Sequence, residues 1–252
     1  VTVIPEWYNP EIENKSGLVE TLDDERFNTI TEPFTVLMIG TLTSQMQQDD
    51  RKNIVNTIKW VSEEFSDKKD VAILIKTNFG KGTTEDKRLC TEYLKKVKSV
   101  LGLGEYPKIK LLHGNMKTKE VAALYSHKNI KMYVSATRGE GYGLPLVEAA
   151  ASGLPIVVTG WSGHLQFLDK DKIGCVDYNL KEISESRIDN RIFKKGFRWA
   201  EPLEASFKRE IRKVYKDHNE SKTRAISMMK NIQTNFDNTT IKKQYDKLFE
   251  GY

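Results

Sequence analysis

The chain has 252 residues, of which 38% are hydrophobic and 30% charged, and it carries a net charge of +5. This length allows one large domain or two small ones, with enough apolar residues for a buried core. No apolar run approaches the ~20 residues that a helix needs to cross a bilayer. The mild basic excess argues against nucleic acid as a partner, since that needs a clustered basic face. It suits an anionic small ligand or loose contact with an acidic membrane surface.

The N-terminal residues and the two cysteines bear on the cellular location of the protein. Residues 1–10 lack the basic and apolar regions of a secretory signal, and the chain begins at Val, which suggests a fragment. Cys90 and Cys175 lie far apart, each in an expected core element. We therefore expect two buried thiols in a reducing cytoplasm.

Apolar runs and helical periodicity alternate through the first two thirds of the chain. Short, largely apolar runs predict buried parallel strands at 35–40, 71–75, 108–112, 132–135 and 155–159. Apolar residues three and four positions apart predict helices at 54–65, 89–101, 121–125 and 147–152. This alternation predicts an α/β domain with a Rossmann-like, doubly wound parallel sheet.

The remaining segments differ in character. Residues 1–32 are polar and irregular, with one short helix expected over 18–27, and we interpret them as an interdomain linker or leading segment. Residues 33–180 form the expected Rossmann-like domain. Residues 181–252 are expected to form a helical C-terminal extension with two or three amphipathic helices packed on that domain. Their lysine-rich faces could touch acidic lipid, although a solvated helix face explains them as well.

A glycine-rich loop follows the fourth expected strand. Gly139, Gly141 and Gly143 lie between that strand and a helix in which Pro145 occupies the first position. In an open α/β sheet, ligands bind at this carboxyl edge. The exposed amides and the helix dipole would favour a phosphate, and glycines let a ligand approach the backbone.

Two carboxylates flank this loop. The helix would place Glu148 in its first turn, where it can accept two hydrogen bonds from a vicinal diol such as a ribose. Glu140 lies in the loop itself and is free to face a second group of hydroxyls. We therefore expect the two acids to hold the two ends of a nucleotide sugar.

The run from Arg138 to Glu148, Arg-Gly-Glu-Gly-Tyr-Gly-Leu-Pro-Leu-Val-Glu, resembles the signature of family 4, or group 1, glycosyltransferases. It is followed by Ser-Gly-Leu-Pro-Ile-Val, which fits the same pattern. That family has the GT-B fold, with two Rossmann-like domains facing a cleft. The resemblance implies that Glu148 binds the ribose and Glu140 the donor-sugar hydroxyls. It also implies contacts to the sugar and diphosphate from the loop residues Gly141, Tyr142, Gly143 and Leu144.

The basic residues of the family are matched only in part. Its first strand ends in Gly and a basic residue, with a Lys about ten positions later. Gly40 fits, but Thr41 replaces the basic residue. The resemblance assigns the diphosphate contact to Lys52, with Arg51 close behind, and we expect Lys76 to add charge at the end of the second strand. A solvated helix start and a surface lysine are the plain alternatives.

Other chemistries fit less well. A dinucleotide fingerprint would need glycine at position 144, which is Leu. Asp169-Lys170-Asp171 is better interpreted as a charged turn than as a metal motif, and the histidines show no ligand-like spacing. We therefore predict no metal site and no cofactor, and metal-independent use of a UDP- or GDP-sugar.

Two functions remain open. One is a retaining glycosyltransferase that moves a hexosyl group to a glycan or lipid-linked saccharide, with Lys52 and Glu140 as its catalytic residues and Glu140 not a nucleophile. The other is a nucleotide-sugar-binding module that is not catalytic alone. All motifs match the second domain of the GT-B fold, so we expect the acceptor-binding N-terminal domain to be absent from this sequence.

Overall fold

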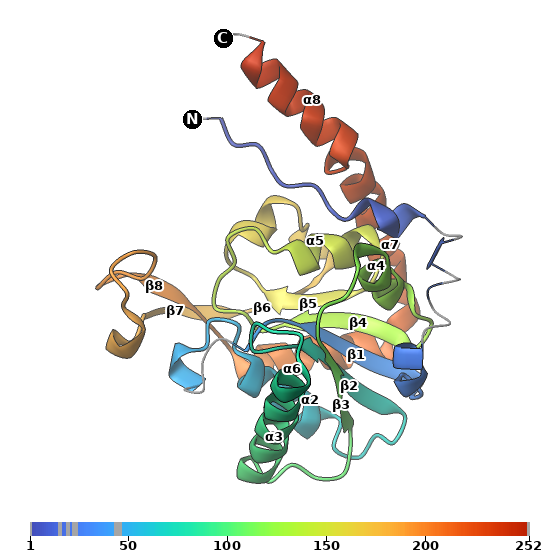
Figure 1. Cartoon of the computed structure of the whole chain (residues 1–252), viewed down its shortest axis with the longest axis vertical. Helices are drawn as coiled ribbons and strands as arrows, with labels where there is room; N and C mark the ends of the chain where they lie inside the picture. Colours follow the sequence, from blue (N-terminus) through green and yellow to red (C-terminus); the bar gives the residue numbers. More distant parts are fainter. Residues whose placement is uncertain (1, 15–16, 19–20, 22–24, 43–46, 251–252) are drawn as a thin grey trace.

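A six-stranded parallel sheet forms the centre of the molecule (Figure 1). The computed structural model describes residues 2–14, 17–18, 21, 25–42 and 47–250. The strand order is β3-β2-β1-β4-β5-β6, and all neighbouring pairs are parallel. The strands are β1 (Phe34–Ile39), β2 (Val71–Thr77), β3 (Lys108–His113), β4 (Ile130–Ser135), β5 (Ile156–Thr159) and β6 (Gly174–Val176). This confirms the predicted doubly wound α/β fold, to which the structure adds the short β6.

Helices cover both faces of this sheet (Figure 1). Successive strand residues point to opposite faces, so Leu37 and Leu74 belong to one apolar cluster while Val36 and Ile73 belong to the other. The first cluster includes residues of α4 (Thr118–Ser126), α5 (Leu144–Ala151) and α7 (His218–Asn235). The second includes residues of α2 (Ile54–Glu64), α3 (Thr84–Val100) and α6 (Glu204–Lys216). The strands β1, β2, β4 and β5 are therefore buried on both sides, which explains their mostly apolar sequences, whereas the edge strand β3 is only partly buried.

Polar first turns explain why some predicted helices were too short. Helix α3 begins at Thr84, five residues before the predicted start, because the Thr83 side chain accepts a hydrogen bond from the Asp86 amide at 3.2 Å. Helix α4 likewise begins at Thr118, where Glu120 accepts from the Lys117 amide at 2.7 Å. Capping residues thus extend both helices beyond their apolar stripes.

In the sequence, an antiparallel hairpin lies between the last strand of the sheet and the C-terminal helices. It consists of β7 (Tyr178–Glu182) and β8 (Arg198–Pro202), and Figure 1 shows it projecting from the body. The sequence analysis expected only helices beyond residue 180, yet that position lies inside β7, with Leu180 opposite Ala200. Most of β7 is exposed, so it lacks the apolar run by which the buried strands were found.

The N-terminal segment packs on the domain. Tyr8, Ile12, Phe27 and Ile30 are buried in the first apolar cluster, and the Tyr8 amide donates to the Phe236 carbonyl at 3.4 Å. Short 3-10 helices form at Pro10–Glu13 (η1) and Glu25–Thr29 (η2). The helix predicted over 18–27 falls partly outside the described residues.

Three C-terminal helices follow the hairpin, α6, α7 and α8 (Asn238–Phe249), within the predicted range of two or three. Helix α6 packs on α2 and on β5 and β6, whereas α7 packs on α5. Helix α8 extends away from the sheet and buries only Ile241 (Figure 1). Among the described residues, no helix combines the length and the hydrophobicity needed to cross a membrane.

The packing of α6 gives a stability prediction. Phe207 is fully buried, and its ring centroid lies 5.5 Å from that of Trp60 on α2. Phe207→Ala should lower the free energy of unfolding by about 3–5 kcal/mol, because it leaves a cavity in the core. Urea unfolding followed by circular dichroism measures this. Phe249→Ala is the matched control, since Phe249 is 65% exposed and its loss should cost less than about 1 kcal/mol. Equal losses in both variants would contradict the assigned packing.

Candidate functional site

The predicted site lies where the strand order reverses. Strands β1 and β4 are neighbours at the centre of the sheet, and the chain continues from them toward opposite edges. In such sheets, ligands bind beside the carboxyl ends of these strands. The two following loops meet there, since the Arg138 amide donates to the Arg51 carbonyl at 2.8 Å. This contact joins the start of α2 to the glycine-rich loop.

Glu140 is held by two cations. Lys52 Nζ lies 2.6 Å from Oε1 of Glu140, and a guanidinium nitrogen of Arg51 lies 3.0 Å from Oε2. Arg51 also donates to the Gly139 carbonyl. The structure thus brings together the two candidate catalytic residues, Lys52 and Glu140, with the candidate diphosphate ligand Arg51.

The charge state of Glu140 follows from this cluster. Burial alone would raise the pKa of its carboxyl, but the charges and hydrogen bonds of Lys52 and Arg51 outweigh burial and lower the pKa. Glu140 is therefore an ionised hydrogen-bond acceptor at neutral pH. Its lone pairs can accept from sugar hydroxyls, whereas the two bound cations reduce its nucleophilicity.

The backbone of the loop is fixed from its other side. Ser162 Oγ accepts from the Glu140 amide at 2.9 Å and donates to the Glu140 carbonyl at 2.6 Å. Gly163 approaches so closely that a Cβ there would lie 1.8 Å from the Gly141 carbonyl oxygen. Nothing within 4 Å would meet a Cβ at Gly141, so this face of the loop is open to a ligand. Tyr142 is turned elsewhere, donating to the Glu6 carbonyl at 2.6 Å.

Helix α5 begins differently from the prediction. Gly143 precedes it with a φ of 97°, which glycine adopts readily, and the helix starts at Leu144. Pro145 is therefore the second helical residue, and Glu148 lies in the second turn instead of the first. The side chain of Leu144 is exposed. The Leu146 and Val147 amides donate to the Gly143 carbonyl at 2.8 and 3.1 Å. The positive end of the helix dipole still lies at the carboxyl edge of the sheet, where it favours a phosphate.

Glu148 occupies a buried site of its own. Tyr125 Oη donates to its Oε2 at 3.1 Å. Burial raises the pKa of Glu148 to about 7, while the Tyr125 hydrogen bond and the Lys76 charge oppose this shift. Burial also lowers the pKa of Lys76, and the charge of Glu148 opposes it. We expected a place in the first helical turn to stabilise the ionised form of Glu148. Burial instead destabilises that form.

A small cavity of 200 Å³ lies at the ends of β1 and β2, beside the start of α5. Gly40, Thr41, Lys52, Lys76 and Pro145 are among the residues that line it. Two ammonium groups and the start of α5 therefore surround a space at the carboxyl end of β1. Thr41 has no charge, so the two lysines supply the positive charge at this point.

Two residues that the sequence analysis gave no role support the site. Arg138 is buried and forms two hydrogen bonds of 2.8 Å with the Glu201 carboxylate on β8. His164 is also buried, and its Nε2 lies 2.9 Å from the Thr159 carbonyl. Its pKa is lowered by burial, and the nearby charges of Glu140 and Lys52 act on it in opposite directions. No signal in the sequence indicated that Arg138 pairs with Glu201 or that His164 is buried beside the site.

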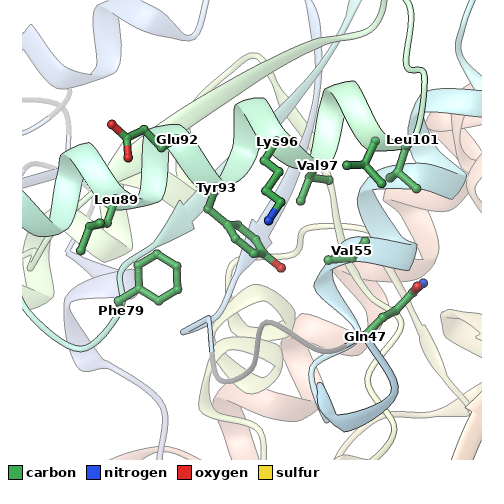
Figure 2. Close-up of a pocket in the computed structure, with 10 residues that line it drawn as sticks. Gln47, Val55, Phe79, Leu89, Glu92, Tyr93, Lys96, Val97 and Leu101 are labelled. Atoms are coloured by element: carbon green, nitrogen blue, oxygen red, sulfur yellow. The ribbon is translucent and has the colours of Figure 1, made fainter.

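A second cavity of 490 Å³ lies between α2 and α3 and is shown in Figure 2. Tyr93, Lys96 and Val97 of α3 face Val55 of α2 across it (Figure 2). None of the predicted site residues lines it. Its walls are mostly apolar, with Glu92, Tyr93 and Lys96 among the polar members of the lining.

One group of possible metal ligands occurs among the described residues. The ligand atoms of Asp86, Cys90 and His113 lie within 4.8 Å of one another. His113 Nε2 lies 3.0 Å from Asp86 Oδ2, and this carboxylate also accepts from the Phe79 amide at 3.1 Å. The group therefore has a structural role without an ion, because it joins the start of α3 to β3 and to the loop after β2.

Comparison with known families gives a match that covers half of the chain. A family model described as family 4 glycosyltransferase in conflict systems matches residues 116–241, which include Glu140 and Glu148. A curated relative is the GtfA subunit of UDP-N-acetylglucosamine–peptide N-acetylglucosaminyltransferase from Streptococcus gordonii. It is 30% identical over 117 residues, covering 45% of this chain and 19% of that protein.

Solved structures share the fold at low sequence identity. HepE from Anabaena, solved with UDP and glucose, has a TM-score of 0.68 and is 14% identical over 100% of this chain and 57% of its own. The C-terminal domain of LpcC, a group 1 glycosyl transferase from Francisella tularensis, has a TM-score of 0.56. It is 15% identical and covers 85% of this chain and 92% of its own. The chain thus spans about half of HepE and nearly all of the LpcC domain.

The raised pKa of Glu148 predicts a pH-dependent stability. Between its ordinary pKa of 4.5 and about 7, the folded state keeps a proton that the unfolded state has released. Stability should therefore fall as pH rises through this window, by up to about 3 kcal/mol, and then level off. Glu148→Gln removes this titration. Urea unfolding of both proteins at pH 5 and pH 7.5 gives the difference, and an identical pH dependence would contradict the assignment.

The contact between Gly163 and Gly141 predicts a local effect. Gly163→Ala should displace the loop, since the added carbon has no space, and should speed hydrogen exchange of the Glu140 amide. Nuclear magnetic resonance measures this exchange. Gly104→Ala is the matched control, because nothing lies within 4 Å of a Cβ there. An unchanged Glu140 amide in Gly163→Ala would show that the loop is not held by this approach.

Proposed function

This chain belongs to the family 4 glycosyltransferases of conflict systems, and on that premise we propose that it is the donor-binding half of a retaining hexosyltransferase. The donor would be a nucleoside diphosphate sugar, with a UDP-sugar favoured over a GDP-sugar. Two of the similar structures, HepE and pneumococcal GtfA, were solved with UDP and a sugar, which supports this choice. The acceptor would be a glycan or a lipid-linked saccharide.

The observation that carries the proposal is the arrangement of charge at the carboxyl edge. Glu140 precedes α5 and pairs with Lys52, Glu148 lies in the second turn of α5 near Lys76, and both lysines line the 200 Å³ cavity. In our assignment, Glu148 binds the ribose diol and Glu140 the hydroxyls of the donor sugar. The lysines and the α5 amides neutralise the diphosphate between these two ends.

The proposed transfer uses this positive charge to stabilise the leaving group. The bond from the anomeric carbon to the β-phosphate oxygen breaks, and its electron pair stays on the nucleoside diphosphate. Lys52 and the helix-end amides stabilise this negative charge. The acceptor oxygen bonds to the anomeric carbon from the same face, and its proton passes to the departing phosphate. Neither a metal nor a protein nucleophile takes part in this scheme.

A binding module without catalysis is the second candidate. The chain spans 57% of HepE and matches an isolated C-terminal domain of LpcC. In this case, a second domain would complete the cleft and bind the acceptor. A transfer assay beside a binding assay separates the two candidates. Donor binding without transfer supports the module, and transfer by this chain alone supports the enzyme.

The location that we propose is the cytoplasm, with peripheral contact to a membrane as the further option. Cys90 and Cys175 are both free, and Cys90 is buried as expected, whereas Cys175 is only partly buried. Burial raises the pKa of each thiol, which lowers its reactivity. Free thiols of this kind suit a reducing compartment.

The site assignment predicts different effects for the two glutamates. Glu148→Gln should weaken binding of UDP and of UDP-glucose alike, by about tenfold or more, because a diol loses its charged acceptor. Glu140→Ala should weaken UDP-glucose more than UDP, since it removes the sugar contact, whereas Lys52 and Arg51 lose an ion pair but keep their charge for the diphosphate. Isothermal titration calorimetry with UDP, UDP-glucose and GDP-mannose measures these effects.

Control measurements keep this test sharp. Glu92→Gln is a matched control, because Glu92 lines the separate cavity between α2 and α3. Its donor affinity should equal that of the unaltered chain. Unchanged UDP-glucose affinity in both Glu140→Ala and Glu148→Gln would overturn the site. Failure of the unaltered chain to bind any nucleotide sugar would overturn both candidate functions.

A further inference from the structure

The glycine-rich loop over residues 138–143 is here called the donor loop. A cavity of 510 Å³ lies between this loop and the β7–β8 hairpin. Glu140, Gly141 and Trp161 line one wall, and residues of β8 and of the segment between the strands line the other. The lining includes Arg51 but neither Lys52 nor Lys76, so this space is separate from the smaller cavity that we assign to the diphosphate. Its volume is that of a pocket for a small molecule.

The hairpin is fixed to the donor loop, so this cavity is preformed. Arg138 lies in the loop and binds Glu201 of β8, and its guanidinium carbon lies 5.2 Å from the centroid of the Trp199 ring. The Ala200 amide donates to the Arg138 carbonyl at 3.0 Å. At the far end of β7, Ser186 donates to Asp49 at 2.8 Å. Both walls are therefore held in register by direct bonds.

The hairpin wall is apolar and exposed. Ile192 is 73% exposed and Phe197 is 51% exposed, and both line the cavity. On the opposite wall, Trp161 lies against the donor loop, with its ring 3.2 Å from the position of a Cβ at Gly139. Exposed apolar side chains gathered in one cavity indicate a surface that a ligand covers. Aromatic rings facing a cavity suit the apolar face of a sugar ring.

The same cavity has positive charge that acids on its lining do not neutralise. Arg187 stacks on Phe193, with its guanidinium carbon 4.3 Å from the ring centroid, and lines the space. Arg198 also lines it and lies 4.0 Å from Glu182, at the outer limit of an ion pair. Glu140 is the acid in the lining, and Lys52 and Arg51 already bind it. Arg187 also lies near Asp189, whose pKa is lowered by hydrogen bonds from backbone amides and by the charge of Arg187, but Asp189 does not line the cavity. The guanidinium groups of Arg187 and Arg198 can thus bind an anion.

We propose that this cavity is an acceptor subsite for an anionic saccharide. The sugar ring would stack on Phe197 and Trp161, and its phosphate or carboxylate would bind Arg187 and Arg198. This inference rests on the proposed function, because an acceptor must lie beside the donor sugar held by Glu140. It assigns to the donor half of the protein a part in choosing the acceptor.

The probe is glucose 6-phosphate, titrated into the full chain with UDP at saturation so that the nucleotide site is filled. Saturation-transfer nuclear magnetic resonance and calorimetry should show binding that is tighter than for glucose or inorganic phosphate alone. Glucuronic acid tests whether a carboxylate replaces the phosphate. Phe197→Ala and Arg198→Gln should each weaken glucose 6-phosphate by about tenfold, with UDP affinity and circular dichroism unchanged.

The hairpin offers matched controls. Leu180 is 50% exposed on β7, and Arg191 lies between the strands, but neither lines the cavity. Leu180→Ala and Arg191→Gln should therefore bind glucose 6-phosphate as the unaltered chain does. An equal loss in Arg191→Gln would show diffuse attraction to a basic hairpin and would overturn the subsite.

Two further outcomes overturn this inference while leaving the proposed function intact. One is UDP binding without any binding of glucose 6-phosphate or glucuronic acid. The other is binding to vesicles of phosphatidylserine and phosphatidylcholine that Phe197→Ala abolishes, with no saccharide bound, which would make the hairpin a membrane contact. Absence of UDP binding, by contrast, contradicts the proposed function. Binding of glucose 6-phosphate then supports or overturns the saccharide site by itself.

Discussion

A single buried guanidinium joins the parts on which the site depends. Arg138 donates to the carbonyls of Gln47 and Asp50 before α2, and it binds Glu201 on the hairpin. Burying one such charge without partners would cost several kcal/mol. All its bonds are made only when the loop, the start of α2 and the hairpin occupy these positions. The geometry around Glu140 therefore follows from satisfying Arg138.

The parallel sheet provides the second constraint. Because all six strands run the same way, the segments that follow β1, β2 and β4 end at one edge. Gly40 follows β1, Lys76 lies near the end of β2 and Glu140 follows β4, and the sheet places these distant residues around one region. Three basic side chains face two carboxylates at that edge, with Lys52 and Arg51 beside Glu140, and Lys76 near Glu148.

Much of this could be predicted from the sequence, because its signals were local. Continuous apolar runs identified five of the six strands of the parallel sheet, and the glycine-rich loop with its two glutamates identified the site. The exposed strand β7 gave no such signal, and the three-residue β6 was too short. The hydrogen bond from Tyr125 to Glu148, and the pairing of Arg138 with Glu201, join residues from distant segments. Side-chain partners of this kind follow from tertiary packing, which periodicity does not encode.

The hydrogen bond from Tyr142 to the Glu6 carbonyl links the N-terminal segment to the donor loop. Displacement of that segment is transmitted to the loop through one bond and through the Tyr142 ring, whose centroid lies 4.9 Å from that of Phe167. A hydrogen bond of this type contributes about 1 kcal/mol net, or less than twice the thermal energy. Loss of this one bond would therefore separate the N-terminal segment from the loop at a small cost, while Ser162 still holds the loop backbone at Glu140.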